Sequence, residues 1–174
     1  MIIISDRLKR GEMVSVWICR AGKRGVYHQL FVEEKRIYLA WAGLDKDLRS
    51  FCDEVALKNF VAAECDDNTA TAISTHWNQV HIFASKMQTG DYVITPSCSA
   101  GQYSIGLITS DYNYVCDSHL FHHYRTVSWL LHDVERKNFS VKMQHTLGAY
   151  RTVFQLKDDA EFHTFINRSF AERM

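Results

Sequence analysis

The feature that most constrains this chain is its hydrophobic period, which changes twice along the sequence. Short β-branched and aromatic runs at 14–20, 27–32 and 36–41 predict three strands. The glycines of AGKRG would turn the first strand into the second. From Asp47 onward, apolar residues recur at steps of three and four, which predicts a helix.

A second helix and a return to strands complete the pattern. Asn68 or Thr69 is expected to cap the second helix, and QTGD then leads back to short alternating runs. Strands are expected at 92–95, 103–108, 124–131 and 152–156, and helices at 138–147 and 158–170. This order predicts an α+β fold whose sheet curls on itself, with helices packed outside it. No repeat or linker interrupts residues 1–174, which are expected to form one domain.

Charge and cysteine usage narrow the functional classes. The 20 Lys and Arg residues balance the 20 Asp and Glu residues, so no global positive field indicates a nucleic-acid partner. The 5 cysteines share no CxxC spacing, which favours reduced thiols in a reducing compartment. The opening MIII is too short for a signal peptide or a membrane span. A cytoplasmic protein without a membrane partner is expected.

Catalytic signatures are missing from the sequence. It contains no nucleophile elbow, glycine-rich phosphate loop or HExxH pattern, so neither catalysis nor a cofactor is expected of this domain. The alternative is a metal-dependent enzyme that uses the segment CDSHLFHHYR. Its possible ligands are Cys116, His119, His122 and His123. Their spacing matches no standard zinc pattern, and adjacent residues of a strand point in opposite directions, so we expect no metal.

Aromatic side chains near strand ends indicate a binding pocket instead. Trp41 ends the run RIYLAW, and three tyrosines lie at other strand ends or in a loop. Such rings could stack on a nucleobase, which contributes about 1–3 kcal/mol per base. The candidate pocket residues are Trp41, Tyr103, Tyr112 and Tyr114, with Asp45, Asp47 and Ser97 as hydrogen-bonding groups.

Basic residues are unevenly distributed in spite of the neutral net charge. They gather in the first 36 residues, where Arg20, Lys23 and Arg24 surround the expected turn. A local positive patch is sufficient for phosphate contacts. An ordinary solvated hairpin is the alternative interpretation.

Several stretches together resemble one known family. VWICRAGKRG, IYLAWAGLDKDL, FASKMQTGDYVITPS, YSIGLITSDYNYV, HHYRTVSWLLHDVERKNF and TLGAYRTVFQL are similar, in this order, to the N-terminal domain of Mrr-type restriction endonucleases and related antiphage proteins. The resemblance runs from about Val14 to Leu156. That domain is similar to the EVE and YTH modules of the PUA-like superfamily, which are small curled β-barrels flanked by helices.

The resemblance implies a reader of modified DNA. Such a module takes one flipped, methylated or hydroxymethylated base from a double strand into an aromatic pocket and serves a restriction or defence system. By pattern Trp41 matches a cage tryptophan of YTH readers, with Tyr103, Tyr112 or Tyr114 as the opposing wall. Modified RNA is the alternative ligand. A nuclease or another effector domain, on another segment or on a partner, would then act on the bound nucleic acid.

Phosphate contacts are expected from four basic residues. These are Arg20, Lys23, Arg24 and Arg125. For Arg125 an internal brace is the alternative role, and Trp77 and Trp129 are expected to support the core.

Overall fold

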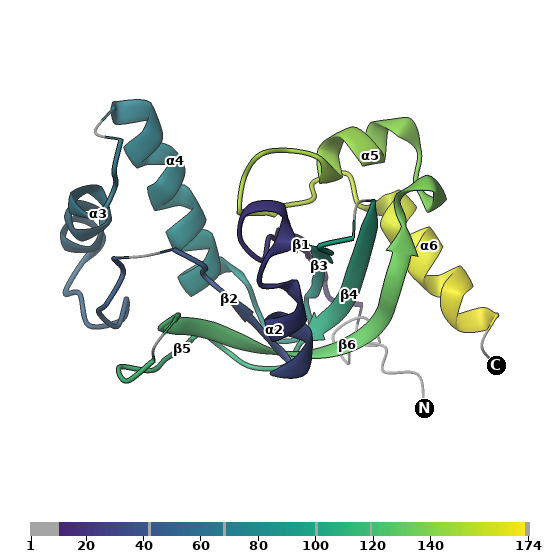
Figure 1. Ribbon diagram of the computed structural model, residues 1–174, viewed down its shortest axis with the longest axis horizontal. Coiled ribbons are helices and arrows are strands. Elements are labelled where there is room, and N and C mark those ends of the chain that lie inside the picture. Colours follow the sequence, from purple (N-terminus) through teal and green to yellow (C-terminus); the bar gives the residue numbers. More distant parts are fainter. Residues whose placement is uncertain (1–10, 42, 68, 100, 119, 173–174) are drawn as a thin grey trace.

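A curled mixed sheet with helices on both sides forms the frame of the molecule (Figure 1). The computed structural model describes residues 11–41, 43–67, 69–99, 101–118 and 120–172. The strands are β1 (Val16–Cys19), β2 (Arg36–Tyr38), β3 (Tyr92–Pro96), β4 (Gln102–Ile108), β5 (Asn113–Tyr114), β6 (His123–Glu135) and β7 (Val153–Gln155). The helices are η1 (Lys23–Gly25), α2 (His28–Glu33), α3 (Glu54–Ala63), α4 (Ala70–His81), η2 (Ile82–Lys86), η3 (Arg136–Asn138), α5 (Val141–Leu147) and α6 (Ala160–Ala171).

The long strand β6 gives the sheet its curl. The strand order is β2-β6-β4-β3-β1-β7, with β5 also on β6, and among the described strands β1 and β3 are the one parallel pair. β6 pairs with β2 and β5 through its first residues and with β4 through the rest. The β4–β6 register shifts around Ile105, and Asp133 has a φ of 54°, so the strand bends there. The predicted α+β fold with a curled sheet flanked by helices is confirmed.

Each face of the sheet is covered by its own helices. Along β1, Trp17 and Cys19 point to a cluster that also contains residues of α2, α3, α4 and η2. We call this the α4-side cluster. The alternate residues Val16 and Ile18 point to a second cluster with residues of α5 and α6, the α6-side cluster. Figure 1 shows α3 and α4 at one end of the molecule and α5 and α6 at the other.

Side-chain caps define where the helices begin. The carboxylate of Asp53 accepts a hydrogen bond from the backbone of Ala56 at 2.8 Å, so α3 begins at Glu54 rather than near Asp47. The Thr69 hydroxyl accepts one from Ala72 N at 3.3 Å, which confirms the cap predicted for the second helix. The other candidate cap, Asn68, lies outside the described residues. Within the described part of the chain, no helix is long and apolar enough to cross a lipid bilayer.

The predicted strand at 27–32 is wrong, because this segment forms helix α2. Tyr27, Leu30 and Phe31 pack on the α4-side cluster at helical spacing. Six residues of mixed apolar and polar character fit both periods, so the sequence did not distinguish them. AGKRG is therefore not a hairpin turn but leads through η1 into α2. The two-residue strand β5 was not predicted at all, since it is too short to show a period.

Candidate functional site

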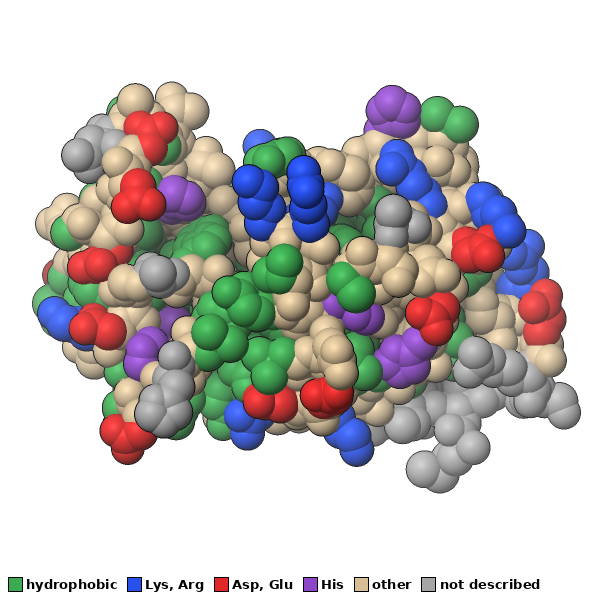
Figure 2. Space-filling view, viewed as in Figure 1, with side chains coloured by type: hydrophobic (Ala, Val, Ile, Leu, Met, Phe, Trp, Pro, Cys, Tyr) green, Lys and Arg blue, Asp and Glu red, His purple; other side chains and the backbone are tan. Residues whose placement is uncertain are grey.

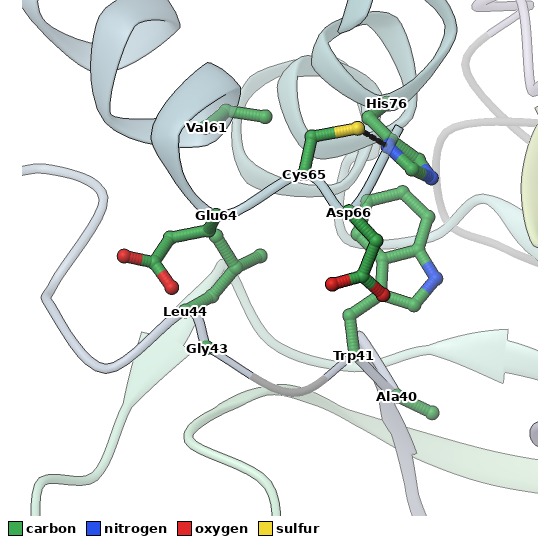
Figure 3. A pocket seen from close by; sticks show the side chains of 9 residues that line it. All are labelled: Ala40, Trp41, Gly43, Leu44, Val61, Glu64, Cys65, Asp66 and His76. Atoms are coloured by element: carbon green, nitrogen blue, oxygen red, sulfur yellow. Dashed lines mark hydrogen bonds between the residues drawn. The ribbon is translucent and has the colours of Figure 1, made fainter. Parts of the chain in front are cut away.

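Trp41 lies just after β2 and lines a cavity beneath the α3–α4 pair (Figure 3). The indole is half-buried, so the ring borders open space rather than being enclosed in the core. The cavity has a volume of about 350 Å³, near the lower end of the range for small-ligand pockets. Its lining residues are Ala40, Trp41, Gly43, Leu44, Val61, Glu64, Cys65, Asp66 and His76.

A histidine from α4 supports the indole. The His76 ring stands edge-on to Trp41, with 4.9 Å between ring centroids and an interplanar angle of 64°. The Cys65 thiol contacts Nδ1 of His76 and donates to the carbonyl of Asp67 at 3.1 Å. These contacts tie the imidazole to the end of α3, so both helices hold the position of the aromatic wall.

Two carboxylates give the cavity a negative character. Figure 3 shows the Asp66 carboxylate directed toward the indole of Trp41, whereas the Glu64 carboxylate points to the opposite side. Glu64 Oε2 lies 2.5 Å from the place where a Cβ on Gly43 would stand. No lysine or arginine of the described residues lines this cavity. It therefore suits a flat group that donates hydrogen bonds and disfavours a phosphate.

Tyr112 and Tyr114 brace the loop behind this cavity. The backbone N–H of Leu48 donates to the Tyr112 hydroxyl at 3.1 Å, and the Tyr114 hydroxyl donates to the carbonyl of Asp45. Burial raises the pKa of Tyr112, so its hydroxyl stays protonated. Neither tyrosine lines the Trp41 cavity. Both therefore support the loop through these hydrogen bonds rather than forming the opposing wall.

His123 completes this support. Its Nε2 donates to the carbonyl of Leu44 at 2.8 Å, so Nδ1 accepts from the Tyr112 hydroxyl at 2.7 Å. Burial lowers the pKa of His123 from 6.5 to about 4, which keeps the imidazole neutral. Because Leu44 lines the cavity, this buried pair of hydrogen bonds fixes one part of the cavity wall.

The two predicted aspartates also lie outside the cavity. Asp45 is exposed, and its carbonyl rather than its carboxylate makes the contact with Tyr114. Asp47 forms an ion pair with Arg49 at 2.9 Å, and the hydrogen bond from that guanidinium lowers the pKa of Asp47. The carboxylate expected from Asp45 or Asp47 in the pocket is supplied by Asp66 instead.

Ser97 and Tyr103 line a different cavity. Tyr103 is 5% exposed and belongs to the α6-side cluster, where its ring packs against Phe139. With Ser97 and Arg20 it lines a cavity of about 200 Å³. Of the predicted base-pocket residues, the structure places Trp41 alone on the cavity beneath α3 and α4.

Lys23 and Arg24 are exposed on η1, as phosphate contacts require. Figure 2 shows Lys and Arg side chains gathered over this part of the molecule, beside a hollow that separates it from the α3–α4 end. Gly25 has a φ of 71°, and a Cβ there would lie 2.9 Å from the Ser97 backbone. The loop that carries the two basic residues therefore packs closely on the loop after β3.

Arg125 is an internal brace, and its predicted phosphate contact is not supported. The side chain is 2% exposed. Its guanidinium donates to the carbonyls of Phe83, Ala84 and Ser110 at 2.8, 3.2 and 3.3 Å. Burial lowers its pKa to about 10, which still leaves the group charged at neutral pH. It ties β6 to η2 and to the loop after β4 and has no access to a ligand.

The histidine-rich segment does not assemble a metal site in the part of the chain that the structure describes. His122 Nδ1 contacts the carbonyl of Val115, and both ring nitrogens of His123 have protein partners. Cys116 is exposed, and His119 lies outside the described residues. The alternative of a metal-dependent enzyme gains no support from this geometry.

Trp41 is the one lining residue that was predicted, and the four polar side chains of the cavity were missed from the sequence. Glu64, Cys65 and Asp66 follow α3 directly, and His76 lies one turn after Ile73 on the apolar side of α4. The polar run ECDD at the end of an amphipathic helix was the one available signal. It could not indicate that this helix end lies over the residues after β2.

Comparison with known proteins adds a family but no function. Residues 16–157 match the model of the family described as "Domain of unknown function (DUF8426)", and the chain belongs to this family. No curated protein and no solved structure matches the chain.

Proposed function

We propose that this member of the family binds one modified base of a nucleic acid in the Trp41 cavity. The observation that carries the proposal is a half-buried indole beside a cavity of about 350 Å³, with a carboxylate directed toward the ring. The resemblance to Mrr-type N-terminal domains, and through them to PUA-like readers, supports the same use. The curled sheet flanked by helices is compatible with that fold.

The cavity chemistry favours a base with an exocyclic amino group. Stacking on Trp41 would contribute about 1–3 kcal/mol, against a cost of a few kcal/mol for flipping the base out of a duplex. The Asp66 carboxylate, an acceptor alone, can accept a hydrogen bond from the amino group of adenine or cytosine. Thymine has no amino group, and its single donor on that edge, N3–H, lies between two carbonyl oxygens that a carboxylate repels. The exocyclic amino group keeps one N–H in N6-methyladenine and two in 5-substituted cytosines, so both kinds of modified base can donate to Asp66.

The backbone would bind outside the cavity. Phosphates are disfavoured near Glu64 and Asp66, whereas Lys23 and Arg24 are exposed on η1. Figure 2 shows basic side chains gathered over this part of the molecule, beside a hollow. The neutral net charge implies modest affinity for any one site. A nuclease or another effector attached to this module would supply the response to binding in a restriction or defence system.

The test is a panel of duplexes that differ in one base. Unmodified adenine and cytosine, N6-methyladenine, 5-methylcytosine and 5-hydroxymethylcytosine are compared by fluorescence anisotropy at one stated salt concentration, with RNA of the same sequence as a parallel series. We expect the wild type to prefer one modified base. Trp41→Ala should remove this preference, because about 1–3 kcal/mol of stacking corresponds to roughly 5- to 150-fold in affinity.

Two variants control this experiment. Trp77→Ala removes the same side chain from α4, where the ring stacks on His81 and does not line the cavity, so the preference should remain. Replacement of Lys23 and Arg24 by Gln should weaken all sequences alike and flatten the salt dependence. If Trp41→Ala, shown to be folded by circular dichroism, still discriminates as the wild type does, base reading by this cavity is refuted.

A further inference from the structure

A second cavity lies at the opposite end of the sheet and differs in charge from the first. It has a volume of about 200 Å³ and lies between the β3–β4 loop and the end of α5. Arg20 and Arg136 both line it, together with Tyr103, Ser97, Gln102 and Gly148. No carboxylate among the described residues lines this space.

The two guanidinium groups are held in place by carbonyl oxygens. Arg20 Nε and Nη2 donate to the carbonyls of Leu147 and Ala149 at distances from 2.8 to 3.1 Å. Arg136 Nη2 donates to the carbonyl of Gln144 at 3.1 Å. The half-buried Arg20 is thereby oriented, whereas Arg136 is exposed and has this one contact. Nη1 of each arginine has no hydrogen-bond partner within the described chain.

Neither positive charge is neutralised by this arrangement. Arg20 and Arg136 form no ion pair with any described residue. Their partners are neutral carbonyls at the C-terminal end of the short helix α5. Capping of this helix end is therefore another explanation for the hydrogen bonds of the two arginines. Capping, however, does not require the guanidinium groups of Arg20 and Arg136 to line the same cavity. Two positive charges without an anionic partner repel each other there. An anion between them would remove that repulsion.

The tyrosine adds a neutral donor to the same cavity. The Tyr103 hydroxyl has no hydrogen-bond partner within the described residues. Burial raises the pKa of Tyr103, with the two arginines acting in the opposite direction, so the phenol stays protonated near neutral pH. The Ser97 side chain lines the cavity beside it. The Ser97 loop also packs on Gly25 of η1, which brings exposed Lys23 and Arg24 toward this side.

We propose that the cavity between Arg20 and Arg136 binds the phosphate group of a phosphomonoester. Two guanidinium groups and a phenol would supply charge-assisted and neutral hydrogen bonds to the terminal oxygens. A terminal phosphate can enter a concave site, whereas an internal phosphodiester is restricted by the chain on both sides. The ligand is either a free mononucleotide or the 5′-phosphate of a strand. This inference does not rest on base reading at Trp41.

The first experiment uses inorganic phosphate as the probe. Amide chemical shifts of the ¹⁵N-labelled protein are followed at low ionic strength as phosphate replaces chloride. Saturable shifts are expected at Gly101, Gln102 and Gly148. Arg136→Gln should weaken binding about tenfold, the effect of one lost hydrogen bond to a charged group. Lys137→Gln is the matched control, since it makes the same charge change at a neighbouring residue whose side chain is 78% exposed, and binding should change less than twofold.

Two further comparisons identify the source of the phosphate. Oligonucleotides with a 5′-phosphate or a 5′-hydroxyl, and adenosine monophosphate, are tested against the same amide signals. If the oligonucleotide with a 5′-phosphate binds more tightly than the one with a 5′-hydroxyl, the ligand is a strand end. If adenosine monophosphate alone binds tightly, the ligand is a free mononucleotide. Trp41→Ala should leave phosphate binding unchanged, which separates this test from the base-reading test. Equal phosphate affinity of Arg136→Gln and Lys137→Gln, or shifts that never saturate, would overturn the proposal.

Discussion

The two sides of the sheet are stabilised in different ways. On the α6 side the contacts are apolar and aromatic, for example between Tyr92 and Phe162 at 5.2 Å and between Phe139 and Phe165 at 4.9 Å. On the α4 side buried polar groups cross-link the same kind of apolar cluster. Apolar burial on the α6 side mainly stabilises the fold, whereas the hydrogen bonds on the α4 side mainly hold loops in one position.

Each polar cross-link on the α4 side fixes a segment that would otherwise depend on weak packing. Gln79 of α4 accepts hydrogen bonds from the backbone of Thr152 and Val153 at 2.7 and 3.0 Å. The Trp17 indole donates to Asp91 at 2.8 Å. Directional bonds of this kind specify one arrangement of α4 and of the segments that lead into β3 and β7, whereas apolar burial tolerates small shifts.

The largest expected effect is on the apolar side. Phe162 is 0% exposed, so Phe162→Ala should lower the free energy of unfolding by about 3–5 kcal/mol through lost burial and a residual cavity. Urea unfolding measures this loss. Phe170→Ala, at the half-buried end of the same helix, should cost clearly less. If both variants lose the same stability, the α6-side cluster is not a stabilising core.

A somewhat smaller loss, of a different kind, is expected on the polar side. Arg125→Met should cost about 3 kcal/mol, because it leaves the carbonyls of Phe83 and Ala84 buried without their donor. Arg151→Met changes the same side chain at an exposed position and should be close to neutral. The Trp41 environment, followed through its indole N–H signal in ¹⁵N-labelled protein, should also shift in Arg125→Met. An unchanged spectrum would mean that Arg125 does not position that end of the molecule.

The smallest effect, over the range from pH 7 to pH 5, is a pH dependence of stability. The pKa of His123 is about 4 in the folded protein and 6.5 when the ring is free, so between these values the unfolded chain binds the extra proton. Stability should therefore fall as the pH is lowered from about 6.5 toward 4, by up to about 1.4 kcal/mol per pH unit. Urea unfolding at pH 7, 6 and 5 measures the slope. In His123→Gln this contribution should vanish, and an unchanged slope would assign the dependence to other groups.

The sequence predicted the frame better than the sites. Alternating or apolar runs predicted β1, β3, β4 and β6, because a buried strand must present apolar residues to its covered faces. The same property concealed the position of Tyr103. Both faces of β4 are buried, so alternation does not show which face a residue joins, and Tyr103 joins the α6 side with Ile105 rather than the side of Trp41.

The aromatic residue after β2 was correctly placed on a cavity, but its neighbours were not. Trp41 stands at the end of a strand, where local pattern is informative. His76 and Asp66 reach it from α4 and from the end of α3, and such contacts depend on how two helices pack over a loop. No spacing in one sequence encodes that packing. Tyr112 and Tyr114 were grouped with Trp41, yet they contact Leu48 and Asp45 of the following loop and do not line the Trp41 cavity.

The two cavities have a consequence for how the molecule meets a charged partner. Glu64 and Asp66 lie at the α3–α4 end, whereas Arg20 and Arg136 lie near α5, so a net charge of zero conceals two cavities of opposite charge at different ends of the protein. A polyanion would attract the arginine end and repel the carboxylate end, so the protein would turn its arginine end toward the polyanion before contact. The screening length is about 8 Å at physiological ionic strength, so this orientation acts in the last stage of approach and weakens as salt is added.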